Sequence, residues 1–321
     1  MSKQKTLWTN KYFVALAAVI ACILWGSAFP VLKITYAELG LTAEDTASRV
    51  VLAGGRFLLA ALLLFALLKW GFRQSTTVQR EYVVPVVTLG LFQTGLQYYF
   101  FYNGLAFTGG IKCAVLNAIG NFFVVIFAHF LYDDDRLNPG KIIGIITGFA
   151  GIVLINWHGA AGFSWSMSFR GEGFLILSGL ASVVGTFQAK KLGRSLNPVL
   201  INAYQLLFGS LVLLVVGVPG VIGREVQFTS LFWGLFVYSA ILSAAAFSIW
   251  YYLLKYNRAG EVTIYRFVIP VSGSLLSALL LPNERLTSAA VISLVLVAFG
   301  IGAVNHWKTI NAPLDRDKLP G

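Results

Sequence analysis

Long apolar runs separated by short polar clusters dominate the hydrophobic pattern of this chain. Each run is continuously apolar, whereas the strands of a membrane β-barrel alternate apolar and polar residues over about ten positions. A helix needs roughly 20 apolar residues to cross a bilayer, and the runs have about that length. We therefore predict an all-α integral membrane protein with ten transmembrane helices, at residues 12–32, 50–68, 82–107, 111–132, 141–157, 173–190, 198–217, 228–254, 261–281 and 289–306.

The composition agrees with a protein that is solvated mostly by lipid. Of the 321 residues, 57% are hydrophobic and only 12% are charged, whereas soluble domains carry about 25% charged residues. The two cysteines, Cys22 and Cys113, lie within or beside apolar runs. We interpret them as packing residues rather than as a disulfide.

The positive charge of the chain predicts its orientation in the membrane. The formal net charge is +11, and Lys and Arg gather at the ends of the apolar runs. Sixteen of the 24 fall on the side of the N-terminus and six on the other side, while Arg56 and Arg266 lie inside spans. Cytoplasmic loops carry the excess of Lys and Arg. We therefore expect both termini in the cytoplasm of a cell inner or plasma membrane, with lipid rather than nucleic acid as the partner.

The first apolar run lacks the small-residue cleavage site of a signal peptide, so we interpret it as a retained span. An N-terminal segment at residues 1–11 and a tail at residues 307–321 are expected in the cytoplasm.

A repeat relates the two halves of the chain. Shifting the first half by 149 residues brings Asp135-Arg136-Leu137 onto Glu284-Arg285-Leu286 and residues 105–110 onto 254–259. We expect one five-helix repeat at residues 12–157, a linking loop at 158–172 and a second repeat at 173–306. Because five is an odd number of spans, the second copy enters the membrane upside down, as in many transporters.

Several motifs resemble the EamA family of the drug/metabolite transporter superfamily. They are WGSAFP at residues 25–30 with Lys33 after it, the pair Arg56-Phe57, and the acidic-Arg-Leu turns after the fourth and ninth helices. The resemblance implies ten helices in two inverted five-helix repeats and a substrate path through a central cavity. The chain departs from the family at Asn121, which stands where the second copy has Pro270.

Polar and aromatic residues inside the expected spans are the candidate substrate site. An unpaired polar group in hydrocarbon costs several kcal/mol, so such residues are expected to face the interior of the bundle. A cavity of amides and aromatic rings is one interpretation, and hydrogen bonds that only fasten helices together are the other. The candidate substrate-binding residues are Trp25, Gln97, Tyr98, Asn117, Asn121, Tyr204, Trp250 and Arg266.

Two arginines lie within expected spans. Arg266 stands about five residues into the ninth run, before Pro270, and a charge at such a depth is by default a functional hypothesis. Its guanidinium suits a substrate carboxylate or phosphate; pairing with Glu261, or reaching towards the headgroups, is the alternative. For Arg56 we expect a structural role, in which it caps carbonyls or binds a neighbouring helix.

Acidic residues are expected only at the ends of spans or in loops. None of the 13 falls in the middle of an apolar run, whereas proton-driven carriers usually titrate such a group. This favours passive facilitation or exchange. Weak proton coupling through His129 is the alternative, because histidine titrates near neutral pH.

A stripe of small residues, Gly144, Gly148 and Gly151, is echoed by Gly300 and Gly302 in the tenth run. Such stripes let helices approach closely. They support either packing within the bundle or a dimer, so both a monomer and a homodimer are expected states.

An enzyme or a channel fits the sequence less well. The three histidines lie far apart, so no HExxH zinc site exists, and no GxSxG elbow is present. The carboxylates of residues 133–135 have the chemistry for Mg²⁺, but no second acidic cluster falls on the same side. A channel needs a repeated filter or a ring of like charge, and one chain with two inverted copies does not provide either.

The sequence therefore predicts a transporter without metal or other cofactor. Its expected substrate is a small polar or amphipathic metabolite, an amino acid or related compound, moved outward by alternating access. A carrier of phosphorylated or other anionic metabolites is the alternative, motivated by Arg266, Lys112 and the net charge.

Overall fold

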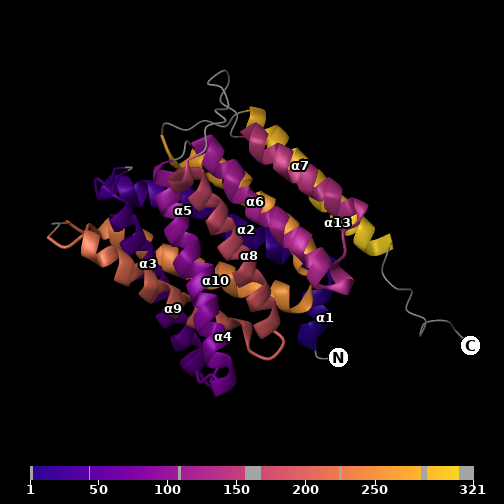
Figure 1. Ribbon diagram of the computed structural model, residues 1–321, viewed down its shortest axis with the longest axis horizontal. Helices are drawn as coiled ribbons and strands as arrows, with labels where there is room; N and C mark the ends of the chain where they lie inside the picture. The colour runs from indigo at the N-terminus through magenta and orange to yellow at the C-terminus, as the bar shows by residue number, and fades with distance from the viewer. Residues whose placement is uncertain are drawn as a thin grey trace, which may run out of the picture.

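The computed structural model describes residues 3–42, 44–107, 110–155, 168–223, 226–282 and 288–310 (Figure 1). Within these ranges every regular element is helical and no strand occurs, which confirms the all-α prediction. The elements are α1 (Lys3–Thr9), α2 (Lys11–Glu38), α3 (Thr46–Ala66), η1 (Leu67–Gly71), α4 (Arg80–Gly90), η2 (Leu91–Leu96), α5 (Gln97–Ala106), α6 (Gly110–Leu131), η3 (Asp133–Asp135), α7 (Pro139–Ile155), η4 (Phe169–Gly173), α8 (Phe174–Leu192), α9 (Pro198–Gly217), η5 (Val218–Gly220), α10 (Ser230–Tyr256), α11 (Ala259–Thr263), η6 (Ile264–Phe267), α12 (Val268–Leu280) and α13 (Ser288–Ile310).

Each of the ten predicted runs overlaps one of these helices or a row of consecutive helical segments. By length and composition, six stretches are able to cross a membrane: Lys11–Glu38, Thr46–Gly71, Phe169–Leu192, Pro198–Gly220, Ser230–Tyr256 and Ala259–Leu280. Shorter apolar helices cover Gly120–Leu131, Pro139–Leu154 and Val291–Trp307. The structure is thus that of an integral membrane protein built of helices.

Polar residues between the apolar runs fix where the long helices begin. The side chain of Asn10 caps α2 and accepts hydrogen bonds from the backbone N–H groups of Tyr12 and Phe13, at 3.0 and 3.2 Å. Asn197 caps α9, which has Pro198 in its first turn, and Thr229 caps α10. These caps satisfy N–H groups that have no partner within the helix.

Two of the predicted spans change their helical geometry part of the way along. The third is α4, the π-helical segment η2 and α5 in a row, and the ninth is α11, the 3₁₀ segment η6 and α12. Pro270 explains the second change: it has no N–H for the carbonyl four residues earlier, which belongs to Arg266. The tighter turn therefore carries Arg266 itself.

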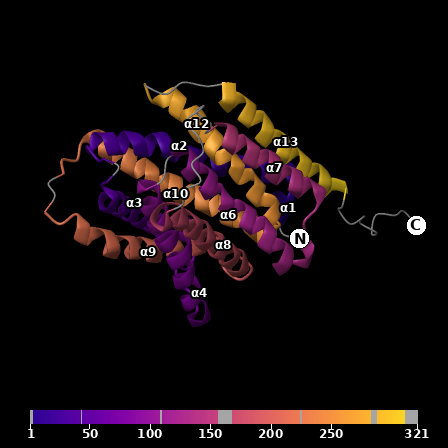
Figure 2. The ribbon, with the colours of Figure 1, turned by 45° about the horizontal axis from the view of Figure 1, so that its top comes forward.

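Helices that are far apart in the sequence pair side by side. α3 packs on α9 on one side of the molecule, and α7 packs on α13 on the other side, in the same arrangement in both views (Figures 1 and 2). Between these pairs, α2 contacts α12 and α10, while α8 contacts α6 and α5. The centre of the bundle is therefore lined by helices from both halves of the chain.

Small residues let α7 lie close to its neighbours. A Cβ atom at Gly144 would lie 3.2 Å from the carbonyl oxygen of Gly300, and one at Gly148 would collide with the ring of Phe267. Gly302, in contrast, has open space around it. The glycine stripe thus serves packing within the chain at Gly144, Gly148 and Gly300.

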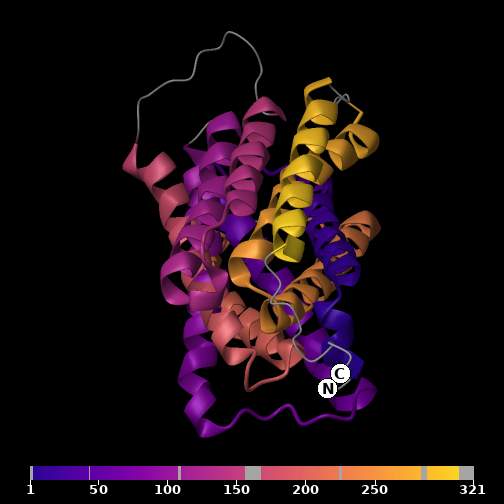
Figure 3. The same ribbon diagram turned by 90° about the vertical axis from the view of Figure 1, so that its right-hand side faces the viewer.

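One end of the bundle gathers α1 and the connections at residues 72–79 and 193–197 (Figure 3). These are the segments that the charge pattern assigns to one side of the membrane, and that this side is cytoplasmic stays a prediction. The short helix α1 was not expected. It is held by Trp8, whose ring stacks on Tyr252 at 4.9 Å and whose carbonyl accepts a hydrogen bond from Asn257 at 2.9 Å.

Several predicted features lie outside the described residues. They are the second charged phrase at residues 284–286, most of the linking loop at 158–172, and the tail beyond residue 310. The side chains of Lys112 and Cys113 are also outside the described part, whereas Cys22 is buried with a free thiol.

Candidate functional site

Three of the predicted site residues form one cluster, which we call the Arg266 cluster: Trp25, Trp250 and Arg266. The guanidinium carbon of Arg266 lies 5.6 Å from the ring centroid of Trp25 and 5.2 Å from that of Trp250. The two indoles meet edge to face with centroids 5.4 Å apart. Such contacts attract a cation to the face of a ring and contribute about 0.5–2 kcal/mol each.

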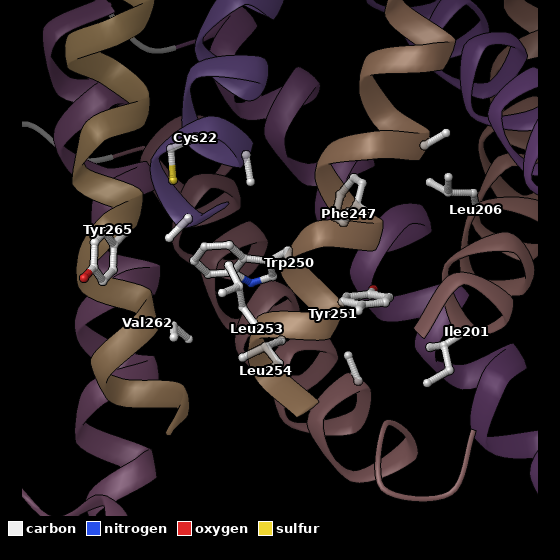
Figure 4. Packing of buried hydrophobic residues seen from close by; sticks show 14 of the residues in the cluster. Cys22, Ile201, Leu206, Phe247, Trp250, Tyr251, Leu253, Leu254, Val262 and Tyr265 are labelled. Carbon is white, nitrogen blue, oxygen red and sulfur yellow. The ribbon is translucent and has the colours of Figure 1, made fainter. Parts of the chain in front are cut away.

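The cluster joins helices from both halves of the chain. Trp25 comes from α2, Trp250 from α10 and Arg266 from η6, and α2 contacts both of the other elements. Figure 4 shows Trp250 pointing to the side where Cys22 and Tyr265 lie, while Tyr251 points the opposite way, towards Ile201 and Leu206. The consecutive residues Trp250 and Tyr251 thus pack on opposite sides of α10.

Two buried hydrogen-bond donors in the cluster have no acceptor among the described residues. They are Nε1 of Trp250 and Nε of Arg266. An indole and a guanidinium only donate hydrogen bonds, so neither group can satisfy the other. A buried donor without an acceptor costs about 1–3 kcal/mol. The cluster therefore leaves two buried donors free for an acceptor from outside the described residues.

Tyr98 connects this cluster to a second buried arginine. Its phenol lies within electrostatic range of both Arg266 and Arg56. The guanidinium of Arg56 lies over the rings of Phe57 and Tyr98, at 4.6 and 5.9 Å from their centroids. Its Nε and Nη1 atoms are buried without an acceptor in the described part of the chain. Of the two roles expected for Arg56, the structure shows the contact with a neighbouring helix, which is made through the ring of Tyr98.

The other predicted site residues have separate surroundings. Gln97 accepts a hydrogen bond from Gln93 at 2.7 Å, and its carbonyl accepts one from Ser178 at 2.8 Å. The hydroxyl of Tyr204 donates to the carbonyl of Thr76 at 2.9 Å and so anchors the connection at residues 72–79. Tyr204 therefore lies outside the Arg266 cluster.

Asn121 is partly buried in α6 and stands three turns from the end of that helix. Asn117 also belongs to α6, but its side chain lies outside the described part of the chain.

The structure also contains a buried polar network, which the sequence analysis did not predict. The hydroxyl of Tyr251 donates to Oε1 of Gln205 at 3.1 Å, and Nε2 of the same amide donates to Thr94. One helical turn away, Nδ2 of Asn202 donates to the carbonyl of Ala244 at 3.0 Å. Asn202 and Gln205 are 0% exposed. Their spacing of three residues, which places both on one face of α9, is the signal that points to the network.

The first charged phrase forms a buried ionic turn. The carboxylate of Asp135 lies 2.6 Å from Nζ of Lys141, and the two side chains are 1% and 0% exposed. The ammonium also donates to the carbonyls of Asp135 and Arg136, both at 2.8 Å. All three donors of the lysine are thereby satisfied, as a buried charge requires.

The same turn ties α6 to the start of α11. The second carboxylate oxygen of Asp135 accepts a hydrogen bond from the backbone N–H of Gly260 at 2.8 Å. Lys190, from α8, donates to the carbonyl of Asn257 at 2.6 Å just before that helix. We call these contacts of Asp135 and Lys190 the end latch. They hold elements of both halves together at the end of the bundle that carries α1.

Two shallow hollows open elsewhere on the molecule. One has a volume of about 270 Å³ and is lined by residues that include Lys11 and His306. The other has about 490 Å³ and is lined by residues that include Leu62 and Trp70. Neither contains a residue of the Arg266 cluster, where Trp250 is 2% exposed. Nor do His, Cys, Asp and Glu side chains of the described residues gather in threes as a metal site needs.

Comparison with known proteins gives the class of the chain. The model of the EamA-like transporter family matches residues 12–157 and again residues 169–305. The uncharacterized transporter YvbV of Bacillus subtilis is 27% identical over 301 residues, and the match covers 91% of each chain. An uncharacterized transporter of Archaeoglobus fulgidus is 26% identical over 257 residues, covering 80% of this chain and 85% of the relative.

A solved crystal structure has the same fold. The TM-score is 0.77 at 17% sequence identity, and the match covers 94% of this chain and 100% of the other. The family match spans both halves of the chain and the relatives are named as transporters, not enzymes. This chain therefore belongs to the EamA-like transporter family and is a multi-pass membrane transporter.

Proposed function

We propose that the protein carries a small polar metabolite with a carboxylate group, an amino acid or a related compound, across the cell membrane. The observation that supports this proposal is the pair of buried donors, Trp250 Nε1 and Arg266 Nε, without an acceptor in the described part of the chain. A carboxylate offers two oxygens with about four acceptor sites. It would satisfy both donors at once, and the guanidinium would bind it in a two-pronged grip.

The substrate's remaining part meets aromatic rings. Trp25 and Phe247 face each other edge to face at 5.1 Å, next to the guanidinium of Arg266. Such rings cover an apolar chain without requiring hydrogen bonds from it. Because Trp250 is buried, we propose that the rings separate when substrate enters and that the described conformation is closed around them.

Alternating access through two inverted five-helix repeats is the mechanism that we propose. Counterparts under the repeat are α2 and α8, α3 and α9, α4–α5 and α10, α6 and α11–α12, and α7 and α13. Exchanging every helix for its counterpart leaves the pairing unchanged: α3 with α9 and α7 with α13 stay, while α2 with α12 becomes α8 with α6. The twofold match of the family model also supports this proposal.

The end latch is the gate that this mechanism would release. Asp135 holds the N–H of Gly260, and Lys190 holds the carbonyl of Asn257. Opening this end requires both contacts to break, whereas the opposite end would then close. We expect transport by facilitation or exchange and in the outward direction, with ten spans and both termini in the cytoplasm.

A carrier of phosphorylated or other anionic metabolites is the second candidate. The unpartnered Nε of Arg266 favours it, because arginine binds phosphate oxygens with the same bidentate geometry with which it binds carboxylate oxygens.

Transport by purified protein in proteoliposomes tests the proposal. Uptake of labelled amino acids is measured into vesicles that contain unlabelled amino acid. Unlabelled panels of amino acids and of sugar phosphates are added outside as competitors. We expect saturable uptake and a loss of roughly tenfold or more in Arg266→Ala, because a charge-assisted hydrogen bond contributes about 1.5–3 kcal/mol. Arg80→Gln, which changes an exposed arginine at the start of α4, is the control. Unchanged uptake in Arg266→Ala would remove the carboxylate grip from the proposal.

A further inference from the structure

Helix α3 presents two arginines on one face. Arg49 and Arg56 are seven residues apart, which is close to two full turns and a rise of roughly 10 Å. Arg49 lies near the start of the helix and is partly buried, whereas Arg56 is 6% exposed. The two guanidiniums therefore follow each other from the end of the bundle towards its middle.

Aromatic rings connect these arginines to the Arg266 cluster. The guanidinium of Arg49 lies 5.0 Å from the ring centroid of Tyr36, and the phenol of Tyr36 is within electrostatic range of Arg49 and Arg56. The phenol of Tyr98 stands in the same relation to Arg56 and Arg266. Each tyrosine thus lies in the field of two successive guanidiniums, and we call Arg49, Arg56 and Arg266 the arginine file.

The charges of this file are not neutralised by acids among the described residues. The ion pairs that the structure contains there involve Asp133, Asp134, Asp135 and Glu261, all at the end of the bundle that carries the latch. Asp45, one turn before Arg49, accepts hydrogen bonds from the N–H and hydroxyl of Thr42. Arg49 itself donates to the carbonyl of Thr42 at 2.8 Å, which is a neutral partner.

Some of the donors of these three arginines also lack acceptors. In the described part of the chain, Nε of Arg49, Nε and Nη1 of Arg56, and Nε of Arg266 are buried without one. Arginine keeps its charge when it is buried, because its pKa stays far above neutral in proteins. Helix fastening by an arginine normally uses a carbonyl or a carboxylate as partner. Four guanidinium donors without an acceptor, spread over three arginines, are instead suited to a mobile anion.

We infer that Arg49, Arg56 and Arg266 form a path for a substrate that carries net negative charge. This inference rests on the proposed transport function, and within it favours the second candidate class, small organic anions such as carboxylates and phosphate esters, over zwitterionic amino acids. Arg49 attracts the anion at the mouth, Arg56 takes it in the middle, and Arg266 holds it between the two tryptophans. Zwitterionic amino acids, which bring a cation to the same place, are poor substrates for such a path.

Uptake into proteoliposomes tests this path with three labelled probes: succinate, glycerol 3-phosphate and leucine. Succinate and glycerol 3-phosphate separate a carboxylate from a phosphate source, and leucine is the zwitterion. The variants are Arg49→Gln, Arg56→Gln and Arg56→Lys, with Arg170→Gln as the matched control. Arg170 is exposed on η4 and is predicted on the same side of the membrane as Arg49. Size-exclusion chromatography first establishes that each variant is folded.

We expect at least one of the two anions to be taken up saturably and in preference to leucine. Arg56→Gln should lower this uptake roughly tenfold or more, since it removes a charge-assisted contact, and Arg56→Lys should restore part of it. Arg49→Gln should raise KM more than it lowers the maximal rate, because an arginine at the mouth acts on capture. Arg170→Gln should behave like the unchanged protein.

Two results overturn the inference. If leucine is transported in preference and Arg56→Gln leaves its uptake unchanged, the path is refuted while the proposed function stands. If none of the probes is transported, the proposed function loses its support, and a binding measurement then tests whether the three arginines form an anion site. In that case, 10 mM succinate or glycerol 3-phosphate should raise the melting temperature of the detergent-solubilised protein at constant ionic strength. No such shift, or an equal shift in Arg56→Gln, refutes the anion path.

Discussion

The buried pair of Asp135 and Lys141 gives a sharp prediction about stability. Replacing Asp135 by Asn keeps the shape of the side chain but removes the charge that faces Nζ of Lys141 at 2.6 Å. The ammonium is 0% exposed, so water cannot replace the carboxylate. Removing one partner of a buried ion pair costs about 3–5 kcal/mol, because the other charge is left uncompensated.

The same turn contains its own control. Arg136 and Asp133 also form an ion pair, at 3.0 Å, but their side chains are 68% and 98% exposed. Pairs of this kind contribute little, since solvent screens them. Asp133→Asn therefore makes the same chemical change in the same turn without the burial, and we expect almost no effect on stability from it.

Thermal unfolding in detergent, followed by intrinsic tryptophan fluorescence, measures the difference. Asp135→Asn should lower the melting temperature by roughly 5–15 °C, which corresponds to the loss of about 3–5 kcal/mol. Adding Lys141→Met should recover part of this loss, because the uncompensated charge is then gone. If Asp135→Asn is no more destabilising than Asp133→Asn, the reasoning from burial is refuted.

Other contacts of the structure make further predictions. Gly148→Leu should destabilise the protein by about 1–3 kcal/mol, because its side chain collides with the ring of Phe267, whereas Gly302→Leu, which meets open space, should not; thermal unfolding compares the two. Trp8→Ala removes the stack on Tyr252, a contribution of about 0.5–1.5 kcal/mol. It should therefore speed proteolytic cleavage of the N-terminal segment, and an unchanged cleavage rate would contradict the role of α1 described above.

Much of the helical framework could be predicted from the sequence. Continuous apolar runs and their polar boundaries predicted helices that the structure places within a few residues, and α9 has the predicted bounds. Changes of helical geometry within a run were harder to predict. The π-helical segment η2 and the 3₁₀ segment η6 depend on how the chain packs, although Pro270 is a sequence signal for η6.

The site could be predicted in part. Aromatic residues and a charge inside apolar runs singled out Trp25, Trp250 and Arg266, which the structure brings together. Tyr204 was grouped with them because it is a polar aromatic residue within a span. Its hydroxyl instead donates to the carbonyl of Thr76 in a connecting segment, and which segment packs against a given helix face is not visible in a pattern of residue types.

The sequence left two structural roles open for Arg56 for a related reason. Whether a buried arginine faces a carbonyl or a ring depends on the neighbouring helix, and the sequence does not contain that distance. Here the neighbour is Tyr98, and Nε and Nη1 of Arg56 have no acceptor among the described residues.

The two inverted repeats, on which alternating access depends, are tested most directly by cysteine labelling. Single cysteines replace Asp133, which is 98% exposed, and Glu284 in the corresponding turn of the second half, in protein whose Cys22 and Cys113 are changed to alanine. A membrane-impermeant maleimide is applied to intact cells and to inverted vesicles. The account predicts that residue 133 reacts only from the cytoplasmic side and residue 284 only from the outside. Reaction of both from one side would contradict it.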